Sequence, residues 1–333
     1  MAEHSTIEWT DATWNPITGC TLVSDGCRNC YAATLAATRL KNHPSRKGLA
    51  RINAAGEAKF TGEVRLNEQW LDQPLRWTRP RMVFVCAHGD LFHENVPDEW
   101  IDRVFAVMAL APQHTFQVLT KRPERARAYV LNREDREIGR AMDRQLSGPH
   151  PVPVLPNVWL GTSVENQATA DARIPHLLGT PAAVRFVSAE PLLGPVDLAQ
   201  ATRRKLRHPS YLNMNLHWVI GGGESGKNAR AMHPDWARSL RDQCVAAGVA
   251  FFFKQWGEWG PLETTAERVG KIGPDTPRAQ WHDACGLITD TPATEDPLTF
   301  FSEGQVFRIG KRAAGRLLDG RTWDQMPGDQ AHG

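Results

Sequence analysis

The chain has 333 residues, of which 41% are hydrophobic and 23% charged, and its formal net charge is +2. This composition is ordinary for a soluble globular protein, and no apolar run reaches the roughly 18–20 residues that span a bilayer, which excludes a membrane protein. The first residues lack the cationic start and apolar stretch of a secretion signal, so we expect a cytoplasmic protein. In that reducing compartment, a local group of cysteines indicates metal binding or catalysis rather than a disulfide.

Three of the six cysteines fall within eleven residues near the start of the chain: Cys20, Cys27 and Cys30. Thiolates are soft ligands that suit iron–sulfur clusters and zinc. Three ligands from one loop leave one position of a cubane cluster open for chemistry, whereas a closed structural zinc site needs a fourth ligand from elsewhere in the chain. Unligated thiols, buried as small hydrophobic groups, are the remaining alternative. The spacing therefore predicts a metal site and favours an iron–sulfur cluster.

Two basic runs contain no acid: Thr38–Arg51, with five Lys and Arg residues, and Arg203–His208. Such runs contact phosphates in nucleic-acid-binding proteins, but they also occur as solvated loops and helix faces. Charge alone leaves both interpretations open.

The strand candidates are short, apolar without alternation, and rich in β-branched and aromatic residues, as in strands buried on both faces of a parallel sheet. They are Arg81–Cys86, Thr115–Leu119, Asn157–Leu160, Val184–Val187, His217–Ile220 and Ala250–Phe253, with weaker candidates at Thr6–Thr10 and Glu63–Leu66.

Helical segments are expected between these strands at Pro97–Leu110, Asn166–Leu178 and Pro234–Ala247. The signals for these helices are proline and acidic residues at the start of a segment, amphipathic spacing within it, and a glycine just after its end. Strands that begin roughly 30 residues apart are typical of repeated βα units. We expect an α/β fold, a complete or partial (β/α) barrel over residues 1–260, with a doubly wound open sheet as the competing architecture. Residues 261–333 are expected to form a C-terminal insertion or lid, at 262–300, and a tail that packs on the barrel.

Polar residues follow each predicted strand. In a parallel barrel the carboxyl ends of the strands open on one face, where active sites gather. The strand ends run into AHGD at 87–90, TKR at 120–122, GTSVE at 161–165, SAE at 188–190, GGGES at 221–225 and KQW at 254–256. They outline a polar basin, although exposed loops are polar for other reasons as well.

Several motifs carry a family resemblance that runs from Trp14 to Pro327. They are TWNPITGC, CRNCYA, GGGESG, FFFKQWG and the closing GRLLDGRTWDQMP. These motifs resemble the phage Gp37/Gp68 family, also described as a three-Cys-motif or domain-of-unknown-function group. The Cys-x6-Cys-x2-Cys spacing is similar to the shorter three-cysteine loop of radical S-adenosylmethionine (SAM) enzymes, from which it differs by three extra residues.

The radical SAM resemblance implies specific roles for the cysteine loop. Cys20, Cys27 and Cys30 would hold a [4Fe–4S] cluster whose fourth iron binds SAM, and Tyr31 would shield the cluster from water. Reductive cleavage of SAM would then lead to hydrogen abstraction from a substrate. The resemblance also implies an electron donor such as flavodoxin or ferredoxin. For a phage-encoded member of the family, the expected location is the host cytoplasm.

Two further groups of residues are candidates for binding the cofactor. Hydroxyl and carboxylate groups that could bind the ribose of SAM end neighbouring strands, although Ser163 and Glu165 could instead cap the next helix. These are Thr162, Ser163, Glu165, Ser188 and Glu190. A glycine-rich turn that brings backbone close to a cofactor is predicted at Gly222, Gly223, Glu224 and Ser225; a P-loop for a nucleoside triphosphate is disfavoured there because Asn228 occupies the Ser/Thr position.

The remaining candidates concern catalysis. Lys121, with Arg122, and Lys254 could bind phosphate, or could form salt bridges with Asp90 or Glu190. Cys86 could donate a hydrogen atom to a substrate radical, or be a buried inert thiol.

These features predict an iron–sulfur enzyme with radical SAM chemistry on DNA, another nucleic acid or a nucleotide, in repair or modification. One alternative is a zinc-stabilised nucleic-acid-binding protein without catalysis. Another is a Mg-dependent nuclease or phosphoryl transferase that uses the acidic strand ends. The sequence does not indicate the oligomeric state.

Overall fold

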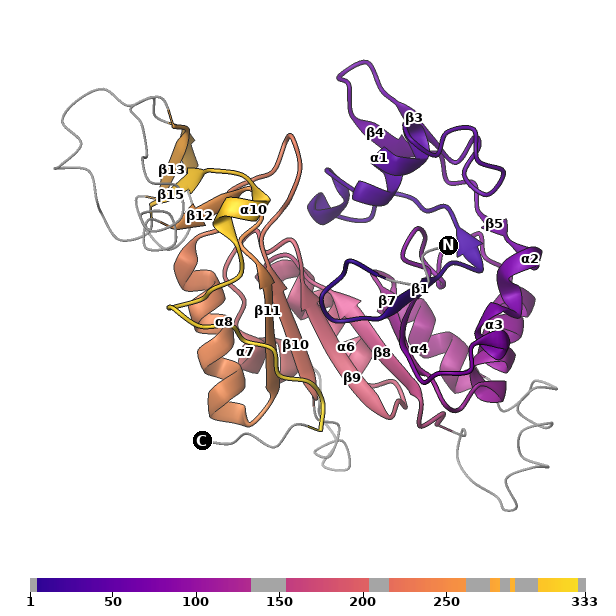
Figure 1. Cartoon of the computed structure of the whole chain (residues 1–333). Coiled ribbons are helices and arrows are strands. Elements are labelled where there is room, and N and C mark those ends of the chain that lie inside the picture. Colours follow the sequence, from indigo (N-terminus) through magenta and orange to yellow (C-terminus); the bar gives the residue numbers. More distant parts are fainter. Residues whose placement is uncertain are drawn as a thin grey trace, which may run out of the picture. The chain divides into compact units, whose positions relative to one another are not determined.

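The computed structural model describes residues 5–132, 154–203, 216–261, 276–281, 288–290 and 305–328. Its main element is a parallel sheet with the strand order β1-β6-β7-β8-β9-β10-β11 (Figure 1). The strands are β1 (Ala12–Trp14), β6 (Met82–Val85), β7 (Thr115–Thr120), β8 (Val158–Ser163), β9 (Val184–Ala189), β10 (Trp218–Gly222) and β11 (Ala250–Gln255).

The strand order identifies the architecture. A doubly wound sheet reverses its order at a switch point, whereas these strands follow one another across the sheet in the order in which they occur in the chain. This is the winding of a (β/α) barrel, so the expectation of an α/β fold with a partial barrel is confirmed. All six main strand predictions are confirmed. The prediction at Thr6–Thr10 is wrong because the first strand is Ala12–Trp14, which pairs with β6.

The chain divides into two compact units. Unit 1 comprises residues 1–163, 173–186 and 205–216, and unit 2 comprises residues 164–172, 187–204 and 217–333. The boundary expected at residue 260 stays a prediction. The proposed lid at 262–300 and the basic run at 203–208 lie almost wholly outside the described residues.

In unit 1, two helices cover the parallel strands: α3 (Asp98–Leu110) and α4 (Pro123–Leu131). The buried face of α3 carries Ile101, Val104 and Met108, the spacing of an amphipathic helix. Tyr129 of α4 packs against Phe105 with ring centroids 5.4 Å apart, and its hydroxyl donates a hydrogen bond to Asp102 on α3. These contacts hold α3 and α4 together through both a pair of rings and a partly buried hydrogen bond.

A long excursion separates β1 from β6. It contains two small antiparallel sheets, β2 with β5 and β3 with β4, and α1 packs on the β3–β4 hairpin (Figure 1). The weak candidate at Glu63–Leu66 contributes only its last two residues, as β5. The elements are β2 (Ile17–Thr18), the 3-10 helix η1 (Asp25–Cys27), α1 (Tyr31–Ala37), β3 (Ala50–Ile52), β4 (Ala58–Phe60), β5 (Arg65–Leu66), α2 (Glu68–Leu71) and the 3-10 helix η2 (Gln73–Arg76).

Unit 2 holds β10 and β11, with α8 (Pro234–Ala247) packed against both. Proline at the start of α8 and Gly248 after its end, at φ 65°, confirm the predicted boundaries. A second, antiparallel sheet has the order β12-β15-β13-β14. The remaining elements are α6 (Gln167–Leu178), which the unit boundary crosses, α7 (Leu198–Arg203), β12 (Trp259–Pro261), β13 (Arg278–Trp281), β14 (Ile288–Asp290), β15 (Val306–Arg308) and α10 (Lys311–Ala314). None of the helices in the described part of the chain combines the length and apolar character needed to cross a bilayer.

The tail of the chain covers the free edge of β11. The Phe253 N–H donates to the carbonyl of Trp323 (2.8 Å), and the Gln325 N–H donates to the carbonyl of Phe251 (3.2 Å). The side chain of Gln325 accepts a further bond from the Phe251 N–H (2.9 Å). The motif TWDQ therefore pairs antiparallel with β11 and provides hydrogen-bond partners for the backbone groups of this edge strand.

Candidate functional site

The cysteine loop starts at a glycine that no other residue can replace without strain. Gly19 has φ +99°, and its N–H donates to the carbonyl of His88 (3.2 Å). A Cβ at this position would lie 2.1 Å from the carbonyl oxygen of Glu63. Just before Cys20, the backbone therefore bonds to the segment after β6 and passes close to Glu63, which precedes β5. The approach to Glu63 is possible only because residue 19 has no side chain.

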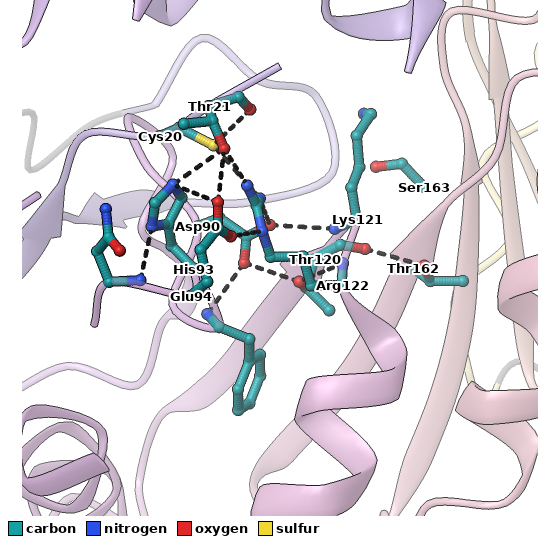
Figure 2. Close-up of polar contacts among 12 residues, drawn as sticks. Cys20, Thr21, Asp90, His93, Glu94, Thr120, Lys121, Arg122, Thr162 and Ser163 are labelled. Carbon is teal, nitrogen blue, oxygen red and sulfur yellow. Dashed lines mark hydrogen bonds and ion pairs between the residues drawn. The ribbon is translucent and has the colours of Figure 1, made fainter. Parts of the chain in front are cut away.

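The next residue, Thr21, is held by three side chains from the loops after β6 and β7 (Figure 2). Its hydroxyl donates to Glu94 (3.0 Å) and accepts from Arg122 Nη2 (2.6 Å). The Nε2 atom of His93 lies 3.0 Å from the same hydroxyl. This anchor fixes the backbone beside Cys20 from two separate strand ends.

The protonation of His93 follows from its contacts. The Asn95 N–H donates to Nδ1 (3.1 Å), so the proton of the neutral ring is on Nε2, which donates to Thr21. Burial, followed by the positive charge of Arg122, lowers the pKa of His93. The fully buried ring is therefore neutral at physiological pH.

Asp90 and Arg122 form the centre of this network. One oxygen of Asp90 accepts bonds from the Phe92 N–H (3.0 Å) and the Thr120 hydroxyl (2.7 Å), and the other accepts from the Lys121 N–H (3.2 Å) and Arg122 Nη1 (3.1 Å). The side chains of Asp90 and Arg122 are 7% and 11% exposed. Four donors leave the Asp90 carboxylate no spare geometry for Mg²⁺, which disfavours the metal-dependent nuclease alternative.

Arg122 connects this centre to the thiol. Its Nη1 lies 3.6 Å from Cys20 Sγ, and its Nε donates to Glu94 (2.6 Å). Burial opposes the charge of Arg122, but Asp90 and Cys20 raise its pKa. Burial likewise opposes ionisation of Glu94, yet the bond from Arg122 lowers the pKa of that carboxyl to about 2. Arg122 and Glu94 therefore both stay charged across the physiological range.

All three cysteines of the motif line one cavity of about 180 Å³ in unit 1. Cys86 lines the same cavity, after β6, so four thiols face it. The cavity lies at the carboxyl ends of β6, β7 and β8, which contribute Asp90, Lys121 and Ser163. This is the face on which parallel barrels place their active sites.

The three cysteines form no disulfide in the described residues, and burial keeps the Cys20 and Cys30 thiols neutral. Burial raises the pKa of Cys20 to about 12, with Asp90 adding to the effect and Arg122 opposing it. Burial also raises the pKa of Cys30, and Cys27 is close enough to raise both values. Buried thiols of this kind become thiolates when a metal cation binds them and displaces the proton.

The donor chemistry fits a thiolate-bound metal, since three reduced cysteines face one cavity. Their arrangement is not that of an assembled site. In the described ranges, no three His, Cys, Asp or Glu side chains form a metal-binding group. The loop around η1 would have to bring the sulfurs together on binding.

Two other predicted residues lie at the cavity. Tyr31 lines it, the residue being 52% exposed, and its hydroxyl donates to the carbonyl of Ala87. Lys121 lines it near Cys30, whose pKa its charge lowers against the larger effect of burial. Cys86 is buried, and burial raises its pKa to about 12. Cys86 also has φ 56°, an unusual conformation for a residue with a side chain.

The residues proposed for the ribose are divided between the two units. Ser163 lines the cavity, whereas Thr162 is fully buried and donates to the carbonyl of Thr120 (2.9 Å). Glu165 is also fully buried and belongs to unit 2. Its backbone is held by Thr169 and Leu193, and Thr169 is at the start of α6.

Ser188, Glu190 and Lys254 meet in unit 2. Lys254 Nζ lies 3.0 Å from Glu190, and the Ser188 hydroxyl donates to the other oxygen of that carboxylate (3.2 Å). The salt-bridge interpretations of Lys254 with Glu190 and of Arg122 with Asp90 are both confirmed. A Cβ on Gly222 would lie 2.8 Å from Glu190, so this glycine makes room for the carboxylate.

The glycine-rich turn brings backbone close to backbone. A Cβ on Gly223 would lie 2.0 Å from the carbonyl oxygen of Trp256. Glu224 is 6% exposed and binds Arg230 through both of its oxygens (2.7 and 2.9 Å). Ser225 accepts a bond from Gln255 (2.9 Å). In the structure, these residues join the ends of β10 and β11.

Sequence reasoning missed the anchor around Thr21. The sequence pattern does not connect His93 and Glu94 with the cysteine loop, because they lie 72 and 73 positions after Thr21. The sequence did contain one signal for this network. An acid, Asp90, and an arginine, Arg122, follow two successive predicted strands. Strands that are adjacent in a parallel sheet bring such ends together.

A family model described as "Protein of unknown function (DUF5131)" matches residues 4–327. The match supports the resemblance to the phage Gp37/Gp68 family over nearly the whole chain. It says nothing of radical SAM enzymes, and that resemblance stays a prediction. No curated protein and no solved structure matches the chain.

Proposed function

The chain belongs to the DUF5131 family, whose function is unknown, and we propose that it is an iron–sulfur enzyme with radical SAM chemistry. In this proposal Cys20, Cys27 and Cys30 hold a [4Fe–4S] cluster, and SAM is the cosubstrate. The substrate is a nucleic acid or a nucleotide. A one-electron donor such as flavodoxin or ferredoxin supplies the reducing equivalent.

One observation carries the proposal. Three reduced cysteines from one loop line a single cavity at the carboxyl ends of parallel strands, in a partial (β/α) barrel. A cluster held by three thiolates would supply an electron to a sulfonium compound bound at its open iron. This combination of fold, ligand number and cavity supports redox catalysis more than a structural role.

The residues around the cavity have defined tasks in this proposal. Arg122 holds the charge of the Cys20 thiolate by its Nη1 donor and orients the loop by its bond to Thr21. Ser163 is the one residue of the predicted ribose set that lines the cavity. Lys121 offers a cation to a phosphate, and Cys86 offers a hydrogen atom to a substrate radical. Lys254 and Glu190 bind each other in unit 2, so we assign them no catalytic step.

Anaerobic reconstitution tests the proposal. We expect about four iron and four sulfide per chain, and an EPR signal of the reduced protein that changes when SAM is added. Replacement of Cys20, Cys27 or Cys30 by Ala should abolish the signal. Cys244→Ala is the matched control, because Cys244 is a fully buried thiol of α8 far along the chain. Iron that is retained equally by Cys20→Ala and Cys244→Ala protein would refute the assignment.

A second candidate is a zinc-stabilised nucleic-acid-binding protein. It is favoured by Cys86, which gives the cavity a fourth thiol and hence the donor set of a closed structural site. Zinc at one equivalent per chain in protein isolated without added metal, and its loss in Cys86→Ser protein, would establish this candidate. Zinc-free protein that still binds iron after Cys86→Ser would exclude it.

A further inference from the structure

The positive charge of the chain is concentrated in one segment beside the cavity. Residues 28–59 contain seven Lys and Arg residues and a single acid, Glu57, hence a charge of +6. The whole chain carries +2, which leaves −4 for all the other residues together. We call residues 28–59 the basic lobe; they comprise α1, the turns after it and the β3–β4 hairpin (Figure 1).

Four cations of the basic lobe face solvent: Arg39, Lys41, Lys47 and Arg51. None of the four forms an ion pair with a carboxylate in the residues that the structure describes. Two others, Arg28 and Lys59, both pair with Glu57, which is the acid of the lobe. Unpaired surface charges of one sign create a local field that attracts a polyanion.

The basic lobe forms a wall of the cavity. Tyr31, Ala58 and Lys59 of the lobe line the cavity together with the cysteines. The mouth also exposes large apolar side chains: Leu22 is 60% exposed and Val23 40% exposed, in addition to the half-exposed ring of Tyr31. A cationic surface beside exposed apolar and aromatic groups is the combination found where single-stranded nucleic acids bind, since the cations contact phosphates and the rings stack on bases.

We infer that the basic lobe binds single-stranded nucleic acid and directs one base of it to the cavity. Delivery of a base for reaction rests on the proposed function, whereas binding of the strand by the lobe does not depend on it. The thiols, Asp90 and Arg122 line a cavity, so a base must leave the stack of a duplex to reach them. A single strand requires no such separation. Arg39, Lys41, Lys47 and Arg51 would contact phosphates, and Tyr31 would provide the stacking surface.

Fluorescence anisotropy with a labelled oligonucleotide of about 15 nucleotides tests the inference. The protein is the full chain, and salt is varied from about 50 to 200 mM. Replacement of all four exposed lobe cations by Gln should weaken binding at least tenfold and reduce the slope of log K against log salt by about 3, since each phosphate contact on a single strand contributes about 0.7. The control replaces four exposed cations elsewhere by Gln: Arg79, Lys227, Lys311 and Arg312.

Tyr31 gives a second, independent measurement. Tyr31→Ala should weaken binding about tenfold through loss of stacking, whereas Tyr31→Phe keeps the ring and should bind within about twofold of the native chain. Tyr31→Phe also removes the hydroxyl contact with Ala87, so it separates stacking from that structural bond. Equal losses in both variants would refute the stacking role.

Three outcomes would overturn the inference. The control quartet could reduce affinity as much as the lobe quartet, the matching duplex could bind as tightly as the single strand, or polyglutamate or anionic vesicles could bind as tightly as the oligonucleotide. The same assay on protein with all three motif cysteines replaced by Ala distinguishes the two proposals. Retained binding by this variant would support the lobe independently of any cluster, whereas failure of the native chain to take up iron would refute only the iron–sulfur assignment.

Discussion

Two acid–base pairs at strand ends differ in what they contact besides each other. In unit 1, Asp90 and Arg122 connect the ends of β6 and β7 to the loop that carries Cys20. In unit 2, Glu190 and Lys254 bind chiefly each other, and glycines close the adjacent backbone around them. Polar residues after buried strands are therefore of two kinds. Some hold a neighbouring loop in position at a cavity. Others form an ion pair with each other at a place where two backbone segments approach closely.

The largest expected difference between the two regions concerns the loss of the acid. Asp90→Ala leaves the guanidinium of Arg122 buried with one carboxylate partner fewer, and should cost about 3–5 kcal/mol of unfolding free energy. Glu190→Ala should cost about 1–2 kcal/mol, because Lys254 is 20% exposed and can be hydrated. Urea unfolding followed by circular dichroism measures both. Equal costs would contradict the distinction between the pairs.

The next prediction concerns pH and the strand end beside Asp90. Burial, followed by the charge of Arg46, lowers the pKa of His88 to about 4. Arg46 donates to His88 Nδ1 from Nε (3.1 Å) and Nη2 (3.0 Å), so a proton on Nδ1 would displace these bonds. Between pH 6.5 and pH 4 the unfolded chain binds this proton and the native chain does not. Stability should therefore fall by about 2–3 kcal/mol as pH decreases through that window.

His88→Gln supplies the control for this effect, because its amide oxygen can accept from Arg46 without titrating. The variant should show a shallower loss of stability between pH 6.5 and pH 4 than the native chain. Parallel pH profiles would show that another group is responsible.

A third prediction compares a glycine in close contact with neighbouring backbone, Gly19, with one that has open space around it, Gly56. Gly19→Ala places a Cβ 2.1 Å from a carbonyl oxygen at φ +99°, and should destabilise unit 1 by about 2 kcal/mol or more. Gly56→Ala is the control, because Gly56 also has positive φ but no atom within 4 Å of the added carbon, and it should cost about 1 kcal/mol. Thermal unfolding distinguishes the two, and similar costs would show that backbone conformation alone matters.

The smallest predicted effect is on the anchor. Thr21→Val removes a hydroxyl with three partners and should cost about 1–2 kcal/mol. It should also expose Cys20, so alkylation of that thiol followed by mass spectrometry should become faster. Thr202→Val, which removes one hydroxyl bond in unit 2, should leave the rate unchanged. An unchanged rate in Thr21→Val protein would mean that Arg122 alone holds the loop.

The sequence predicted the barrel well, because its strands are continuous apolar runs such as Val83–Val85 and Phe251–Phe253, buried on both faces. The prediction failed at β1. This strand is only three residues long, Ala12–Trp14, which is too short to show the hydrophobic periodicity that identifies a strand. The cysteine loop was found from local spacing. The anchor of Thr21 was not, because it depends on contacts between residues that only the sheet brings together.

The edge of β11 is the last part of the sheet to be satisfied during synthesis. Its antiparallel partner, around Trp323 and Gln325, leaves the ribosome only after all the parallel strands have done so. Until then β11 presents free backbone donors and acceptors, which can pair with another nascent copy as readily as with their own tail. A chain truncated before Trp323 would keep that edge open permanently, so aggregation, rather than loss of the cavity, is the failure to expect.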